Sequence, residues 1–262
     1  MEYLPNHLAR IVRAVGRMYY LTNTQLRTLF DYSPQSASHV EELTHELTAE
    51  RGYLLKLPRE LYGRGSPPQV HVLSQKGWNW LAEQELVAGR YREAEKRAQS
   101  GSSGALPHTL EVNDVLIAFE RLHRRQDRIR LTGYFHERDI KKLRLSAYPD
   151  AWIEVQVQEG EQTPASDVYL LELDRDHEDE SKIRDKVSRL VNFIGSRSYI
   201  DAFGSDLFRA VLWVAPDERR LDELGRLTKL ELERKRLPHY DQIFRYVTKS
   251  VITDPEWLAQ HL

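Results

Sequence analysis

Three carboxylates in the second half of the chain could together hold a metal ion. Glu172 and Asp174 end the apolar run Val168-Tyr169-Leu170-Leu171, which predicts a strand buried on both faces. Residues two apart on a strand point to the same face. If the segment at Asp150 pairs beside this strand, a spacing of about 4.8 Å brings all three carboxylates around one point, a seat that suits Mg²⁺. Alternatively, the acids cap the strand and pair with nearby arginine and lysine.

The same residues resemble the PD-(D/E)xK nuclease core. The resemblance rests on Pro149-Asp150, followed by an apolar strand that carries Glu172. In that family the pattern ends Glu-x-Lys, and the lysine helps to activate the attacking water. Here Asp174 stands where that lysine is expected, so the motif lacks its catalytic base. Lys182 and Lys186, four residues apart on the next predicted helix, could supply the lysine instead.

A closer resemblance is to the replication-relaxation family of plasmids and integrated mobile elements. It rests on Leu171-Glu172-Leu173-Asp174-Arg175 followed by a helix with Lys186, and on His108 and Asn113 in their setting. The resemblance implies a winged-helix DNA-binding domain joined to a nuclease-like domain.

If the second domain is a nuclease, its catalytic residues are Asp150, Glu172 and Lys186. Asp150 and Glu172, with Glu137 or Asp174, would then hold Mg²⁺, which stabilises charge on the scissile phosphate and lowers the pKa of water. Lys186 would assist that water or contact the phosphate.

Composition narrows the class of protein. The 262 residues suffice for one large or two ordinary domains. The absence of cysteine excludes disulfides, cysteine-based zinc sites and thiol catalysis. No apolar run approaches a membrane span, and the start lacks the features of a signal peptide. We therefore expect a cytoplasmic protein with no membrane partner. The net charge is −2, but basic residues gather in local groups that suit phosphate contact.

The first 88 residues resemble a winged helix-turn-helix. Apolar spacing and capping residues predict three helices within residues 5–51, and two strands follow at 53–57 and 70–73. Between the strands lies a loop rich in Gly, Pro and Arg, of the kind that forms a wing. We therefore predict a DNA-binding domain over residues 1–98, a Ser/Gly linker over 99–107 and a second domain over 108–262.

In a winged helix, the start of the third helix enters the major groove. The expected DNA-contacting residues are Gln35, Ser36, Ser38 and His39, which could contact bases or phosphates, with Arg59 and Arg64 on the wing reaching the DNA backbone. The rest of that helix carries glutamates, which would repel phosphate. Because winged helices also bind proteins, a protein-binding role is the alternative.

The sequence pattern of the second domain predicts a sheet with helices layered on both faces. The order is a helix from about residue 108, three strands at 129–135, 151–157 and 168–173, a helix over 180–200, a strand at 210–214, a helix over 217–237 and a strand at 243–247. This order fits an α/β/α restriction-endonuclease-like core. The fold class expected for the whole chain is therefore mixed α and β.

Two main functions fit these features. One is a DNA-binding protein acting in replication, transfer or regulation of a plasmid or integrated element, with a nuclease-like domain that does not cleave. The other is a Mg²⁺-dependent DNA endonuclease with a relocated lysine. A transcription regulator whose second domain binds a partner is a third reading. The expected partners are double-stranded DNA and replication or mobilisation proteins, with a homodimer as the candidate oligomer.

Overall fold

The chain forms two compact units, and the division between them falls within one helix. The computed structural model describes residues 3–57, 68–87, 91, 105–158, 166–176, 178–204 and 208–261. The N-terminal unit spans residues 1–117 and the C-terminal unit spans 118–262. The boundary lies inside α6 (Ala105–Arg125), whose first turns therefore belong to the N-terminal unit.

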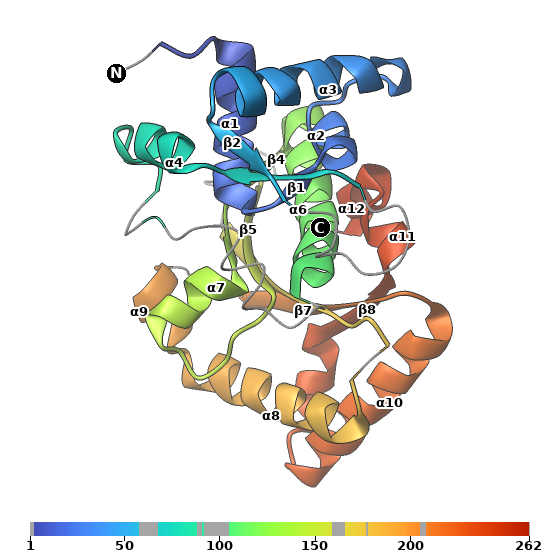
Figure 1. Ribbon diagram of the computed structural model, residues 1–262. Helices are drawn as coiled ribbons and strands as arrows, with labels where there is room; N and C mark the ends of the chain where they lie inside the picture. The colour runs from blue at the N-terminus through green and yellow to red at the C-terminus, as the bar shows by residue number, and fades with distance from the viewer. Residues whose placement is uncertain are drawn as a thin grey trace. The chain divides into compact units, whose positions relative to one another are not determined.

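The N-terminal unit combines short helices with a small antiparallel sheet (Figure 1). Its elements are α1 (Asn6–Met18), β1 (Leu21–Thr22), α2 (Asn23–Leu29), η1 (Pro34–Ser36), α3 (Ala37–His45), η2 (Glu46–Glu50), β2 (Leu54–Lys56), β3 (Val70–Leu73) and α4 (Gln75–Ala82). The strand order is β1-β3-β2. Local chemistry sets the helix starts, because Thr22 forms a capping box with Gln25, and Ser74 caps α4 by accepting from the amide of Gly77.

The start of α6 is bound to the N-terminal unit by polar and apolar contacts. The buried Asn113 amide donates to the carbonyl oxygens of Met18 and Tyr20, at 3.1 and 2.6 Å. Leu106 lies in the same apolar cluster as Tyr20 and Val70. The helix begins at Ala105, inside the stretch predicted as linker; residues 99–104 lie outside the described residues.

The C-terminal unit is built on one five-stranded mixed sheet of order β4-β5-β6-β7-β8. Its elements after α6 are β4 (Ile129–His136), α7 (Glu137–Ile140), η4 (Lys141–Leu143), β5 (Ala151–Val157), β6 (Ser166–Leu173), α8 (Glu180–Ser196), α9 (Tyr199–Phe203), β7 (Phe208–Ala215), α10 (Glu218–Arg234), η5 (Pro238–Ile243), β8 (Phe244–Thr248), α11 (Lys249–Ile252) and α12 (Pro255–His261). The mixed α and β class and the succession of strands agree with the prediction.

The directions of the strands bring several strand ends to one edge of this sheet. β5 pairs antiparallel with both β4 and β6, whereas β6, β7 and β8 are parallel. The carboxyl ends of β4, β6 and β7 therefore share an edge with the start of β5. We call this the carboxyl edge; it holds Glu137, Asp150 and Asp174.

One face of the sheet is covered by α8 and α10, which pack against each other (Figure 1). Alternation along β6 sends Val168 and Leu170 into the apolar core with Ile183 and Val187 of α8. Tyr169 points to the opposite face, where its ring lies 6.5 Å from that of Phe119. Glu172 therefore projects toward α8. None of the described helices is long and apolar enough to cross a membrane.

Three arginines of the C-terminal unit adopt left-handed backbone conformations at helix ends. Arg144, Arg197 and Arg236 have φ of 55°, 55° and 61°. Glycine is favoured at such positions because a Cβ atom costs about 1–2 kcal/mol there. Because arginine rather than glycine stands at residue 197, the sequence does not indicate a helix end there. The single helix predicted over 180–200 is wrong: the structure has two helices, α8 and α9.

Candidate functional site

Asp150 and Glu172 are neighbours across two paired strands at the carboxyl edge. Ala151 pairs with Leu171, so continuing the register by one residue sets Asp150 opposite Glu172. The Asp150 amide donates to the carbonyl of Leu171 at 2.9 Å, and its side-chain Oδ2 accepts from the amide of Leu173 at 2.7 Å. Both acids are buried, with exposed fractions of 9% for Asp150 and 2% for Glu172.

Lys186 of α8 supplies the positive charge at this point. Its Nζ lies 3.0 Å from Oε2 of Glu172 and 3.2 Å from Oε1 of Glu178, and 5.5 Å from the centre of the Trp213 ring. The position follows from the helix, because Lys186 lies between Ile183 and Val187 on the side of α8 that faces the sheet. We call Asp150, Glu172, Glu178 and Lys186 the buried charge cluster.

Burial and mutual attraction shift the pKa values in this cluster. Burial raises the pKa of Glu172 above its ordinary value of 4.5; the charge of Lys186 opposes that rise, and Asp150 adds to it. Burial alone would lower the pKa of Lys186, but the charges of Glu172, Asp150 and Glu178 outweigh it and raise that pKa. Lys186 therefore remains charged at neutral pH and is the counter-ion of the surrounding acids.

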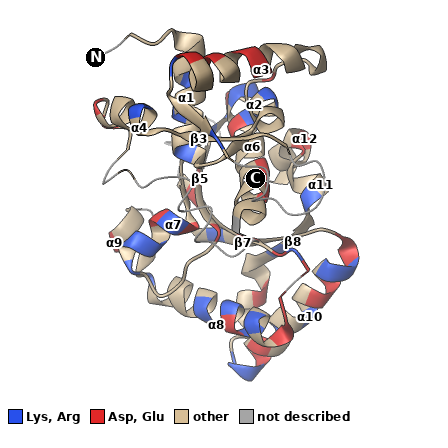
Figure 2. Ribbon diagram, in the orientation of Figure 1, with Lys and Arg blue, Asp and Glu red and all other residues tan. Residues whose placement is uncertain are grey.

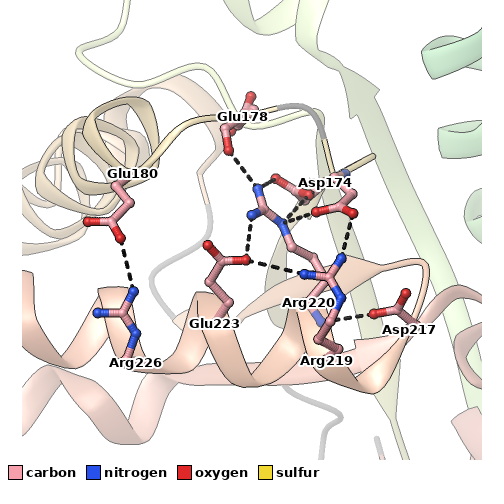
Figure 3. A network of polar contacts seen from close by, with 9 residues as sticks. Asp174, Glu178, Glu180, Asp217, Arg219, Arg220, Glu223 and Arg226 are labelled. Atoms are coloured by element: carbon pink, nitrogen blue, oxygen red, sulfur yellow. Dashed lines mark hydrogen bonds and ion pairs between the residues drawn. The ribbon is translucent and has the colours of Figure 1, made fainter.

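Asp174 belongs to a second network, drawn in Figure 3, which meets the buried charge cluster at Glu178. Arg220, near the start of α10, donates from Nε and Nη2 to the two carboxylate oxygens of Asp174 at 2.8 and 2.9 Å. Both side chains are buried, with exposed fractions of 4% and 0%. The same guanidinium donates to the carbonyl of Glu178 and to Oε2 of Glu223, each at 2.8 Å. Hydrogen bonds to Asp174, outweighing burial, raise the pKa of Arg220.

Through its hydrogen bond to the Glu178 carbonyl, Arg220 holds in place the segment in which Glu178 contacts Lys186. Sequence reasoning singled out neither Arg220 nor Glu178 for a role. One signal was available: Arg220 shares helical spacing with Leu224, Leu227 and Glu231 on the buried stripe of α10. A charged residue on such a stripe requires a partner.

The four candidate metal ligands therefore do not surround one common point. Asp174 pairs with Arg220, and Glu137 pairs with Lys141 at 2.6 Å, although the Glu137 amide donates to the carbonyl of Asp150. Among the residues that the structure describes, no group of three or more His, Asp or Glu side chains could hold a metal ion. The arrangement as it stands does not fit the octahedral oxygen shell that Mg²⁺ requires, because Lys186 takes the cation position beside Glu172.

The candidate DNA-contacting residues lie around η1 and the start of α3. Gln35, Ser38 and His39 are exposed. Ser36 is half-buried, and its hydroxyl lies 3.0 Å from that of Ser33. Arg59 and Arg64 lie outside the described residues.

Acidic residues follow one another along α3 (Figure 2). Glu41 and Glu42 are exposed on it, opposite the buried Val40 and Leu43. Glu46 is held by Arg51 through an ion pair of 2.6 Å. Two carboxylates therefore remain close to any phosphate backbone that this helix approaches.

Sequence comparison identifies a family. The family described as Replication-relaxation matches residues 12–205. No curated protein and no solved structure matches the chain.

Proposed function

The chain belongs to the replication-relaxation family, and on that premise we propose that it is a DNA-binding protein acting in replication, transfer or regulation of a plasmid or integrated element. The observation that carries the proposal is the element order of the N-terminal unit, α1-β1-α2-α3-β2-β3, with a sheet of order β1-β3-β2. This order is typical of a winged helix-turn-helix, in which α3 is the recognition helix.

The C-terminal unit supports the proposal as a nuclease-like scaffold. Its three antiparallel strands followed by a helix and a parallel strand place Asp150, Glu172 and Lys186 together. Since Lys186 neutralises Glu172 and Arg220 neutralises Asp174, we assign the unit a binding and structural role. The alternative is a Mg²⁺-dependent endonuclease, favoured by the convergence of these three residues; it requires Lys186 to release Glu172.

The direct test is binding of the intact protein to labelled duplex DNA. We expect affinity to fall as salt rises, because phosphate contacts release counterions. Gln35→Ala should change the preference among duplex sequences, whereas Arg59→Ala and Arg64→Ala should weaken binding to all sequences alike. Absence of duplex affinity even at low salt would refute the DNA-binding proposal and favour a protein-binding role.

The acidic face of α3 gives a sharper prediction. Because Glu41 and Glu42 repel phosphates, the variant Glu41→Gln/Glu42→Gln should bind all duplexes roughly two- to fivefold more tightly at low salt. The gain should shrink as salt rises. The matched control is Glu83→Gln/Glu85→Gln, which removes two exposed carboxylates at the end of α4. Fluorescence anisotropy measures both. An equal gain in the two variants would mean that only net charge matters and that α3 does not approach the DNA.

A further inference from the structure

Residues 137–150, between β4 and β5, form a loop whose two ends meet at the carboxyl edge. We call this loop the excursion. The Glu137 amide donates to the carbonyl of Asp150 at 3.0 Å, so both ends of the segment meet beside Asp150. Within it, Ile140 and Ala147 enter the apolar core and anchor the excursion. Between these anchors, Leu145 also packs against the core, and residues 141–144 and 146 are exposed.

Large apolar side chains are exposed on and beside this excursion. Leu143 and Tyr148 are 44% and 38% exposed, and Phe135, next to it on the edge strand β4, is 39% exposed. Phe135 rests on Phe203, whose ring stacks on Trp152 with 4.0 Å between centroids. Exposed aromatic rings fixed by a rigid core are suited to stacking against another flat ring.

The excursion is also basic, in a chain whose net charge is −2. Between residues 137 and 149 lie Arg138, Lys141, Lys142 and Arg144 against the acids Glu137 and Asp139. Lys141 and Lys142 are exposed and make ion pairs with those two half-buried acids, and ion pairs at the surface exchange partners at little cost. The exposed Arg144 has no ion pair with a described residue, and it holds a left-handed conformation in which glycine would be more stable.

We propose that Phe135, Leu143 and Tyr148, with Lys142 and Arg144, form a binding surface for single-stranded nucleic acid. The proposal rests on the DNA-binding function and adds a second, different nucleic-acid site on the C-terminal unit. The basic side chains contact the phosphates, and the rings stack on unpaired bases without regard to sequence. In a duplex the bases are already stacked, so the exposed rings would find no partner there.

The test measures the affinity of the intact protein for a fluorescein-labelled single-stranded oligonucleotide, with a duplex in parallel. Tyr148→Ala should weaken single-strand binding about tenfold, as loss of one base stack does, whereas Tyr148→Phe should bind like the parent. Arg144→Gly should weaken it several-fold and reduce the slope of log affinity against log salt by about 0.7.

A matched control separates lost contact from altered backbone. Arg236→Gly removes another exposed, left-handed arginine, but one that precedes β8 and so lies away from the carboxyl edge. Both glycine variants should melt no lower than the parent, and only Arg144→Gly should lose single-strand affinity. Duplex binding through the N-terminal unit should be unchanged in all of these variants.

Parent-like single-strand affinity in Tyr148→Ala and Arg144→Gly would overturn the proposal, as would absence of single-strand binding by the parent. Retained duplex binding in that case would leave the proposed function standing. Loss of both kinds of binding in the parent would overturn the two together.

Discussion

Replacing Lys186 by methionine is expected to destabilise the C-terminal unit by about 3–5 kcal/mol at neutral pH, the usual cost of removing one partner from a buried ion pair. The substitution leaves Glu172 and Glu178 without the ammonium that lies 3.0 and 3.2 Å from them. Hydrogen exchange at the amides of β6 resolves this loss from the stability of the N-terminal unit.

The loss should depend on pH, and its sign follows from Glu172. Burial raises the pKa of that carboxyl in the folded state, so the folded protein binds a proton that the unfolded chain has released. Stability therefore falls as pH rises above the ordinary carboxyl value. Lys186 opposes the shift, which brings that pKa to about 8, so its removal should raise the pKa further and extend the fall to pH values at which the parent no longer loses stability. Lys186 itself is charged in both states over this range and adds no slope.

Two further variants sharpen this prediction. Glu172→Gln should reduce the pH dependence, because an amide cannot ionise. Adding Glu172→Gln to Lys186→Met should recover much of the lost stability. A Lys186→Met protein that matches the parent at every pH would show that Lys186 is not the counter-ion of the cluster.

Replacing Arg220 by methionine is expected to lower the free energy of unfolding of the C-terminal unit by about 3–5 kcal/mol. This loss should depend little on pH around neutrality. Asp174, whose side chain is fully buried, would lose donors to both of its oxygens. The segment that carries Glu178 would also lose its hydrogen bond to the guanidinium. Denaturant unfolding of the full chain, followed by hydrogen exchange at β6 and α10, measures the change.

The neighbouring arginine provides the control. Arg219 also makes ion pairs, with Asp176 and Glu223, but its side chain is 65% exposed. Arg219→Met should therefore change stability by less than about 1 kcal/mol. Combining Arg220→Met with Asp174→Leu should restore much of the stability, since a buried pair replaced by apolar groups is tolerated better than half a pair. Equal effects of the two arginine substitutions would contradict the burial argument.

Much of the sheet could be predicted from the sequence, because β6 and β7 contain continuous apolar runs and parts of β4 and β5 alternate apolar with polar residues. The strand predicted at residues 151–157 has those bounds in the structure, and the strand after it begins two residues earlier than predicted. Asp150, Glu172 and Lys186 could be placed together because strand alternation and helix spacing are local rules. Asp174 was assigned to the same point by that alternation, but it lies just past the last residue of β6, where Arg220 holds it.

The remainder depends on contacts between distant parts of the chain. Arg220 is 46 residues from Asp174, and no local pattern links them. The first turns of α6 were assigned to the second domain because their apolar spacing continues without a break to Leu122. Their place in the N-terminal unit depends on Asn113, which is 95 residues from Met18.

The most direct test of the account is incubation of the intact protein with supercoiled plasmid, in Mg²⁺, in Mn²⁺ and in EDTA. We expect the plasmid to be retarded on a native gel at low salt and to be recovered supercoiled after the protein is removed, in all three conditions. Plasmid that is nicked or linear with the metal ions but intact in EDTA would contradict a non-cleaving scaffold, and absence of retardation at low salt would contradict DNA binding itself.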